Sequence, residues 1–574
     1  PDAFAGSSWF VGLAGGAASV GDFTTAVEEL AADLSLPPEA SEFSVVDVSD
    51  TSVAAAAVDN SALLLGRALM ALAVAAIVVG GFGVLQTLAR HHTASARARE
   101  IEPALGLTRG QQAAARLVTG LVPAVLAAVI TGVAALLTAR VEPIGAIHLY
   151  EPHPGAALNL TVMGVGVVSV LLAVLLAAVL TGRPSGRRAE PLRESSIVAR
   201  VTRLGGSPPT VLGLRFALEA GRGSRAVPVR SAIAGAIVGV AGVVGGLLFV
   251  SSLDRLTTSP SRSATPFDAY VSDVKVADFR DEVLPDPLVG DVAIVRSAPV
   301  TLDQLTVSGH AVDELRGPLD IGLESGRMPR TPDEITLGLR LARDLGLDVG
   351  DPVAVRRPNG RVRELAVVGL AVIPPFNGEE LGLNALLTNE GLDANASAAA
   401  FTSAAVEAAP GVDVDALMEV LSARYEAEVQ SRPVAVLNLE QLGRLPEAVA
   451  VLVGSIAVFA LANALVVAVR RRRRDLAVLR ALGCTRRETA TSVLVMALTI
   501  VGLGVIVGVP LGIAIGSTLW RATAAGAFVL ADPAIRWELV LVPVGAAIAI
   551  ALLAAAIPAG QAAGQSPADG LRVE

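Results

Sequence analysis

The sequence predicts a polytopic α-helical membrane protein that carries a large α/β domain outside the membrane. The first observation is composition: of 574 residues, 53% are hydrophobic and only 17% are charged, whereas a typical soluble domain has about 25% charged residues. The second is a series of long apolar stretches, and the third is the arginine that recurs after every other stretch. Each predicted element follows from one of these observations.

A membrane helix needs about 20 mostly apolar residues to cross the hydrocarbon of a bilayer. Seven stretches meet this requirement, with charged residues almost absent inside them. Because seven is odd, the two ends of the chain are expected on opposite sides of the membrane. The predicted spans are 62–88, 112–138, 159–181, 229–252, 447–469, 491–519 and 538–558.

Arginine placement sets the predicted orientation, because short loops rich in arginine stay in the cytoplasm. Arginine is frequent after the first, third and fifth spans, whereas Arg140 is the only arginine between the second and the third. We therefore place the first residues outside, the last residues inside, and residues 253–446 in one extracytoplasmic domain. The excess of alanine, valine and arginine indicates a GC-rich bacterial genome, and hence a bacterial plasma membrane.

Five consecutive arginines, Arg470–Arg474, follow the fifth span in a chain whose net charge is -9. Such a run can bind nucleic acid, contact lipid headgroups or form a solvated face. Its position at the inner end of a span favours anionic lipid, which attracts each basic residue by about 1 kcal/mol. Membrane lipids are therefore expected partners, and nucleic acid is not.

The segment that follows this run has a counterpart earlier in the chain. RDLAVLRALGCTRRET at 474–489 aligns without a gap with RAREIEPALGLTRGQQ at 97–112, a shift of 377 positions. Both halves also end in a span, small and polar residues, a proline and Leu-Arg. Because an internal repeat determines the architecture, we predict a duplicated unit.

Four glycines recur every four residues on one face of the sixth span. Small residues at this spacing let two helix backbones approach closely. The stripe therefore predicts helix packing, either within the chain or across a dimer face. Its members are Gly504, Gly508, Gly512 and Gly516, and their counterparts in the first copy are Ala127, Thr131, Ala135 and Ala139.

The loop between the fifth and sixth spans predicts a short amphipathic helix. Leu476, Val478, Leu479 and Leu482 recur near helical spacing and form an apolar face. Gly483 can end this helix in a left-handed turn, and Thr485 can cap the next helix with Glu488 as in a capping box. Two interpretations remain, a docking element for a partner protein or an interfacial helix lying on lipid.

With this loop and the glycine-rich helix after it, the chain resembles the FtsX-like permease domain of MacB-type, or type VII, ABC systems. SGRMPRTPDEITLGLRLARDLGLDVGDPVAV at 325–355 is similar to the MacB-like extracytoplasmic core domain. VLGLRFALEAGRGSRAVPVRSAIAG at 211–235 resembles the pre-helix segment of two-domain actinobacterial members.

The resemblance implies duplicated FtsX-like permease repeats, of which the first is N-terminally incomplete, and we expect a further span before residue 1. The implied organisation is a remnant of the first extracytoplasmic domain at 1–60, the first permease repeat of three membrane helices at 61–182, a cytoplasmic linker at 183–228, a membrane helix at 229–252, the extracytoplasmic MacB-like core domain at 253–446, and the second repeat of three membrane helices at 447–574.

In this family the loops between the second and third helices of each half dock onto a separate cytoplasmic ABC ATPase dimer, which binds ATP and Mg²⁺. The first loop departs from the pattern, because Glu102-Pro103 stand where Leu479-Arg480 stand in the second. The residues implied in coupling are Asp475, Leu476, Leu479, Arg480, Leu482, Gly483, Arg486, Arg487 and Glu488, with Ala104, Leu105, Gly106 and Arg109 in the first copy.

The chain is not expected to be an enzyme. A phosphate-binding loop needs a lysine after a glycine-rich turn, and the sole lysine, Lys275, lies in SDVKVAD. The sequence shows no metal-ligand spacing and no catalytic constellation, since its histidines are scattered: His91, His92, His148, His153 and His310. No cofactor is expected in this chain.

The sequence of the domain at 253–446 predicts an α/β fold. DVAIVRSAPVTL and RELAVVGLAVI carry the β-branched runs of strands. DEITLGLRLARDLGL predicts a strand that leads into a short helix, and Asn359-Gly360 is a hairpin signal.

Three functions are compatible with these patterns. The first is a permease that exports or extracts an amphipathic cargo, such as a lipid, lipoprotein, peptide or drug, by mechanotransmission from the ATPase. The second is an FtsEX-like transmitter that activates an external cell-wall hydrolase. The third is a receptor whose spans serve only as passive anchors. It is disfavoured, because seven spans exceed what anchoring needs. The doubled architecture favours the first, with an extracytoplasmic protein or lipid as candidate cargo.

Overall fold

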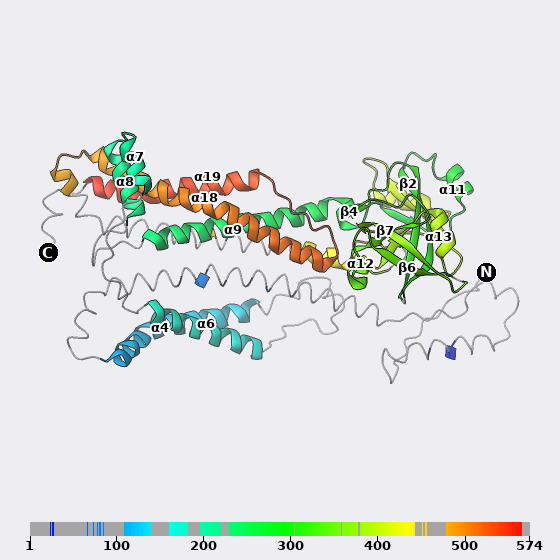
Figure 1. Cartoon of the computed structure of the whole chain (residues 1–574), viewed down its shortest axis with the longest axis horizontal. Helices are drawn as coiled ribbons and strands as arrows, with labels where there is room; N and C mark the ends of the chain where they lie inside the picture. Colours follow the sequence, from blue (N-terminus) through cyan, green and yellow to red (C-terminus); the bar gives the residue numbers. More distant parts are fainter. Residues whose placement is uncertain are drawn as a thin grey trace. The chain divides into compact units, whose positions relative to one another are not determined.

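The computed structural model describes residues 108–138, 160–181, 196–219, 229–303, 305–357, 359–376, 379–441 and 478–564, with a few single residues elsewhere. The chain divides into two units, Pro1–Leu64 and Leu65–Glu574. Only Phe23, Ala26 and Val27, all helical, are described in the first unit. Every element below belongs to the second unit, which Figure 1 shows in sequence colours.

Long apolar helices occupy five of the seven predicted spans. They are α4 (Arg109–Thr138), α6 (Leu160–Thr181), α9 (Val229–Thr258), α18 (Arg486–Ala527) and α19 (Glu538–Gly564). Among the described residues, α4, α6, α9 and α18 are long and apolar enough to cross a membrane, and α19 holds a shorter apolar stretch, Val540–Ala556. The chain is therefore a membrane protein. The spans predicted at 62–88 and 447–469 lie largely outside the described residues.

The helices α4 and α6 pack against each other as a pair. A Cβ built on Gly120 of α4 would lie 2.7 Å from the Cβ of Ala178 in α6, so only glycine allows this approach. The outer faces of both helices expose large apolar side chains such as Val122 and Leu172. Such faces suit contact with lipid rather than water.

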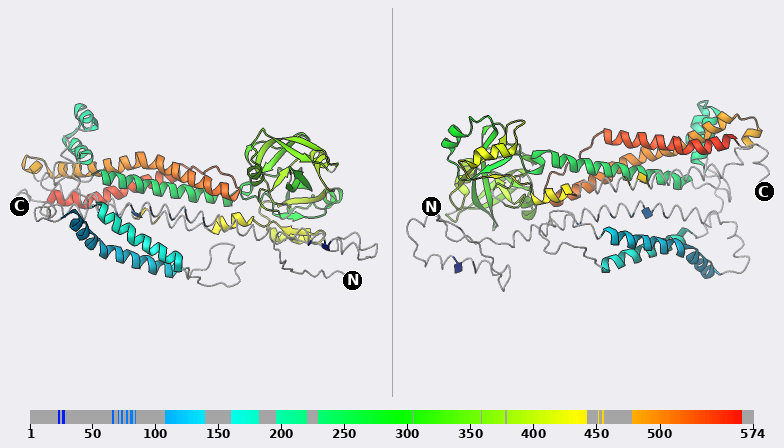
Figure 2. Two further views of the ribbon diagram at one scale, coloured as in Figure 1. Left: turned by 60° about the horizontal axis from the view of Figure 1, so that its bottom comes forward. Right: turned by 180° about the vertical axis from the view of Figure 1, so that it is seen from behind.

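A second helical group contains α9, α18 and α19, which lie side by side in both views of Figure 2. Two shorter helices, α7 (Ser196–Arg203) and α8 (Pro208–Leu218), precede α9 within the linker predicted at 183–228. α8 packs on the first turns of α18, where Phe216 and Met496 share one buried apolar cluster. A Cβ on Gly213 of α8 would lie 2.7 Å from the Ser492 carbonyl oxygen, so the two helices touch through their backbones.

Between α9 and α18 the chain forms a domain of strands and short helices, here called the sheet domain. Its strands are β1 (Ala269–Val271), β2 (Val289–Leu302), β3 (Leu305–Arg316), β4 (Gly322–Gly326), β5 (Glu334–Gly338), β6 (Pro352–Arg356), β7 (Val362–Val372), β8 (Asn384–Leu386), β9 (Phe401–Ala408) and β10 (Ala427–Val429). Its helices are α10 (Pro260–Ser263), α11 (Val276–Glu282), α12 (Leu339–Leu345), α13 (Asn389–Asn395), α14 (Val414–Ser422) and α15 (Val434–Gln441).

The ten strands form one mixed sheet in the order β10-β1-β9-β2-β3-β8-β5-β7-β4, and β6 pairs with both β2 and β7. β6 therefore closes the ring β2-β3-β8-β5-β7-β6, in which β3·β8 and β5·β7 are parallel and the other pairs antiparallel. Buried apolar side chains such as Val300, Ile335 and Leu365 form one cluster contributed by these strands and by α12 and α13. The ring is thus a packed core.

The strands β10, β1 and β9 extend the sheet beyond β2, and α11 and α14 pack beside them. Phe279 of α11 and Leu417 of α14 are fully buried against Val271 and Val406. Apolar side chains on one face of these strands thus pack against apolar side chains of the two helices, as is usual where helices cover a sheet.

The local sequence patterns of this domain are confirmed. DVAIVRSAPVTL lies in β2, and RELAVVGLAVI lies in β7 and the residue after it. DEITLGLRLARDLGL forms β5 and then α12, and Asn359-Gly360 turns between β6 and β7 with Gly360 at φ +74°. A mixed α/β sheet domain between long apolar helices is therefore the observed architecture.

Candidate functional site

The turn before α18, residues 478–485, is the candidate coupling site and is here called the coupling turn. Residues 478–481 are helical. Gly483 at φ +105° ends this helix, with Cys484 N–H donating to the Leu479 carbonyl (3.1 Å) and Gly483 N–H donating to the Arg480 carbonyl (3.1 Å). This pair of bonds is the Schellman motif, which needs a residue that tolerates positive φ. The sequence predicted this role for Gly483.

The helix that follows begins with a complete capping box. The Glu488 backbone N–H donates to Thr485 Oγ1 (3.3 Å), and the Thr485 backbone N–H donates to Glu488 Oε2 (2.7 Å). Two N–H groups that the helix cannot satisfy are thereby bonded. The predicted cap is confirmed, and it fixes the direction in which the coupling turn enters α18.

The candidate coupling residues divide by exposure. Leu482 is 79% exposed at the tip of the turn, and Gly483, Arg486, Arg487 and Glu488 are exposed beside it. Leu479 is half-buried on the cluster formed by α8, α18 and α19, and it lines a small cavity with Pro208 and Leu212 of α8. Arg480 is also half-buried, while Asp475, Leu476 and the run Arg470–Arg474 lie outside the described residues.

The first copy shows the same start of a helix. Its α4 begins at Arg109 and α18 begins at Arg486, so the two helices start 486 − 109 = 377 residues apart. The Thr108 N–H donates to Gln111 Oε1 (2.9 Å), and the Gln111 N–H donates to Thr108 Oγ1 (3.3 Å). Gln111 thus occupies the position of Glu488, although sequence reasoning did not single it out. Ala104, Leu105 and Gly106 lie outside the described residues.

The glycine stripe of α18 lies against α9 of the same chain. A Cβ on Gly508 would lie 2.8 Å from the Ile237 carbonyl oxygen, and a Cβ on Gly512 would lie 2.7 Å from that of Ala241. The same holds at Gly504, facing Ala236, and at Gly516, facing Gly245. In this structure the stripe therefore serves packing within the chain, the first of the two interpretations that the spacing allowed.

The other end of α18 meets the sheet domain at Phe528. This residue ends the helix in the left-handed region at φ 56°, and its ring lies 4.7 Å from the Arg343 guanidinium carbon and 5.6 Å from that of Arg340. Arg343 also donates to the Ala525 carbonyl. Two cations of α12 therefore hold the carbonyl end of α18, where a helix favours positive charge.

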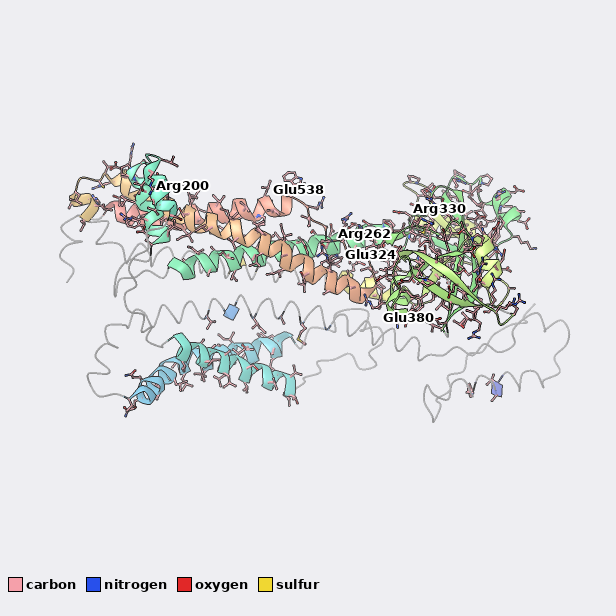
Figure 3. All side chains as sticks on the ribbon, viewed as in Figure 1. Arg200, Arg262, Glu324, Arg330, Glu380 and Glu538 are labelled. Atoms are coloured by element: carbon pink, nitrogen blue, oxygen red, sulfur yellow. The ribbon has the colours of Figure 1, made fainter. Side chains whose placement is uncertain are left out.

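The segment after α18 carries a second contact with the sheet domain. Asp532 accepts two bonds from Arg262 (2.5 and 2.9 Å) and one from Arg255 (3.2 Å), and the Ala531 N–H donates to Glu324 of β4 (3.1 Å). Partial burial alone would raise the pKa of Asp532, but the bonds from Arg262 and the charges of both arginines leave it lowered. Arg262, Glu324 and Glu380 are labelled in Figure 3 where the helices meet the sheet domain.

Sequence reasoning missed Phe528, Arg340, Arg343 and Asp532. No local spacing marks them, because Arg343 and Ala525 are 182 residues apart in the chain. The phenylalanine directly after a long apolar helix was the one available hint.

The sequence also missed a Ser-His-Glu arrangement in the sheet domain. Ser297 Oγ lies 2.8 Å from His310 Nδ1, and Glu379 Oε1 lies 2.6 Å from His310 Nε2. Ser297 is 1% exposed and His310 is fully buried, so no substrate can reach the hydroxyl. In the described part of the chain no group of three His, Cys, Asp or Glu side chains could hold a metal ion.

Comparison with known proteins finds a similarity over the coupling turn, α18 and α19. Residues 448–567 match the family model FtsX-like permease C-terminal. A search of curated proteins returned no match. The part of the chain that contains the coupling turn, α18 and α19 is therefore similar to the C-terminal domain of FtsX-like permeases.

Proposed function

We propose that this chain is the transmembrane permease subunit of a MacB-type ABC transporter. In this proposal a separate cytoplasmic ATPase dimer moves the coupling turn, and α18 passes the motion to the sheet domain, which exports or extracts an amphipathic cargo. The observation that carries the proposal is that one helix, Arg486–Ala527, starts at the coupling turn and ends on the sheet domain. The family match of residues 448–567 supports the class of complex.

The length of α18 suits a transmitting rod. Its 42 residues correspond to about 63 Å at 1.5 Å per residue, against about 30 Å of hydrocarbon in a bilayer. Pro510 removes one hydrogen bond from the helix interior, yet the helix continues on both sides of it. Packing against α9 along the glycine stripe braces α18 through its middle.

The repeated helix starts support a duplicated permease. Besides α4 and α18, the helices α6 and α19 begin 378 residues apart, at Leu160 and Glu538. The two capping pairs, Thr108 with Gln111 and Thr485 with Glu488, occupy equivalent positions. Both copies therefore begin an equivalent helix with the same kind of capping pair, and in this proposal the residues before each cap dock onto the ATPase dimer.

The exposed tip of the coupling turn suits a protein partner. Leu482 projects from the turn with Arg486 and Arg487 beside it, and burying a leucine side chain contributes about 1.5–3 kcal/mol. A partner with an apolar pocket and an acidic rim would fit this surface. ATP and Mg²⁺ bind to that ATPase in the proposal, and the large sheet domain lies outside the bacterial plasma membrane.

The substitution Leu482→Asp tests the proposal. We expect the full-length permease to lose at least about tenfold in affinity for its ATPase, because a leucine contact is replaced by a buried charge. Binding and ATP hydrolysis by the purified complex in nanodiscs are the measurements. Leu204→Asp in the turn between α7 and α8 is the matched control, since Leu204 is also 79% exposed.

Unchanged binding and hydrolysis in the Leu482→Asp complex would contradict the coupling role. Leu482 is a sharper choice than Leu479, whose half-buried side chain supports α18 itself. If the intact complex moved no amphipathic cargo but activated a cell-wall hydrolase, the transmitter function would replace transport.

A further inference from the structure

The core of the sheet domain contains a buried polar chain that ends on a surface segment. His310 of β3 is fully buried, and both of its ring nitrogens have partners, Ser297 of β2 at Nδ1 and Glu379 at Nε2. A carboxylate only accepts, so Nε2–H donates to Glu379, and Nδ1 forms the second bond, with the Ser297 hydroxyl. Both ring nitrogens are thus bonded, and the imidazole is held between β2 and Glu379.

Glu379 begins a five-residue segment, 379–383, here called the bridge. Asn384 Nδ2 also faces Glu379 Oε1 (3.4 Å) and donates to the Pro374 carbonyl (3.1 Å). The Glu379 side chain is therefore held from two directions inside the domain. Since a buried carboxylate is costly unless it is bonded, these contacts favour one position for the bridge.

Glu380 and Gly382 of the bridge contact α12. Glu380 pairs with Arg340, and both side chains are largely buried. The Gly382 carbonyl accepts from the Leu341 N–H (2.9 Å). This N–H lies in the first turn of α12, where the helix itself provides no acceptor. The bridge thus positions Arg340, one of the two arginines that lie over Phe528.

Gly382 brings the bridge to α18 itself. It adopts φ +82°, and a Cβ built on it would lie 2.9 Å from Arg340 N and 3.5 Å from the Phe528 Cβ. The bridge therefore packs between the first turn of α12 and the residue that ends α18. A continuous series of contacts joins Ser297, His310, the bridge and Phe528.

We propose that His310 is a positioning residue that locks the bridge to the core of the sheet domain, so that movement of α18 reaches the β2–β3 ladder instead of being absorbed by a loop. This inference rests on the proposed function only in that α18 is the moving part. The contacts themselves are present in the chain without an ATPase.

Three variants of the full-length protein in nanodiscs test the inference by amide hydrogen exchange, without ATPase. Glu379→Leu removes the acceptor of His310, whereas Glu379→Gln keeps an oxygen that can accept from Nε2–H. Glu380→Gln weakens the pair with Arg340 and leaves the buried chain intact. Asn395→Ala is the matched control, because Asn395 is a fully buried polar residue of α13, bonded to Gly391 and Arg357.

We expect Glu379→Leu to speed exchange about tenfold or more at the Leu341 amide and across residues 525–531, since a bond to a charged acceptor is lost. Glu379→Gln should restore most of the protection, and Glu380→Gln should loosen 525–531 while residues 297 and 310 stay protected. Asn395→Ala should leave 525–531 unchanged.

The inference is overturned if Glu379→Leu speeds exchange only at residues 379–384, while residues 525–531 exchange as in the wild type. His310 would then stabilise only its immediate surroundings. If Glu379→Leu unfolds the sheet domain, unchanged protection of 525–531 in Glu380→Gln overturns it equally. Because no ATPase is present, this result is independent of the Leu482→Asp test, and either proposal can fail alone.

Discussion

At the scale of single residues, four members of the segment 325–355, Gly326, Arg327, Glu334 and Gly346, each have a structural reason. Gly326 adopts φ +77°, and a Cβ there would lie 2.2 Å from the Val368 carbonyl oxygen. Arg327 forms two bonds of 2.7 Å with Glu334, and Gly346 ends α12 in the left-handed region. These residues fix the turns and contacts around β4, β5 and α12, and so position Arg340 and Arg343 of α12.

The Arg327–Glu334 pair predicts a pH dependence. The two bonds from Arg327, helped by the Arg330 N–H, lower the pKa of Glu334 from 4.5 to about 2. Because this pKa is lowered in the folded state, the stabilisation is fully present above about pH 4.5 and is lost as the pH falls toward 2. The unfolding midpoint of Glu334→Gln should therefore lie below the wild type at pH 7, and the difference should shrink between pH 4.5 and 2.

The control for this prediction is Glu364→Gln, which removes an exposed charge from β7. Its midpoint should follow the wild type at every pH. A difference between wild type and Glu334→Gln that stays constant down to pH 2 would show that the pair does not stabilise the fold through its charge.

At the scale of elements, backbone contact along the glycine stripe determines how α9 and α18 pack. Carbonyl oxygens of α9 lie only 2.7–2.8 Å from where the Cβ atoms of Gly508, Gly512 and Gly516 would stand. Backbone cannot move aside as a flexible side chain can. The stripe could be recognised from its spacing of four, but its partner could not, because many helices present small residues and only the folded bundle selects α9.

Gly512→Val should therefore destabilise the bundle, by about 1–3 kcal/mol or more, as overpacking of a tight core does. Gly502→Val is the matched control on the same helix, because a Cβ on Gly502 meets no atom within 4 Å among the described residues. Thermal unfolding in detergent, read by retained monodisperse protein, measures the difference. Equal stability of the two variants would show that the close approach of α9 and α18 is not needed.

At the scale of the whole molecule, the proposed mechanism requires the coupling turn and the sheet domain to lie on opposite sides of the membrane. They stand at the two ends of α18, whose length exceeds the bilayer hydrocarbon. The sole cysteine, Cys484, lies in the coupling turn. The chain therefore carries a natural probe of sidedness.

In intact cells a membrane-impermeant maleimide should not label the wild-type protein, and should label it once the membrane is opened. Cys484 is only half-buried, so the reagent can reach its thiol once it has entered the cell. Labelling in permeabilised cells is therefore the positive control. A Cys484→Ser protein with Glu282→Cys, on the exposed side of α11, should be labelled in intact cells. Labelling of Cys484 from outside would reverse the orientation that the arginines predict.

The sequence alone determined the features that depend on neighbours within one or two turns of chain. The described spans are continuous apolar stretches, and the Schellman turn at Gly483, the cap at Thr485 and the hairpin at Gly360 each require only residues a few positions apart. The tertiary structure alone decided which helix meets the glycine stripe, how β6 closes the ring, and that Arg343 reaches the end of α18. It also assembled Ser297, His310 and Glu379 from three places in the chain. These pairings join residues that are far apart in the sequence and meet only because of the path of the folded backbone. Spacing along the sequence therefore does not predict them.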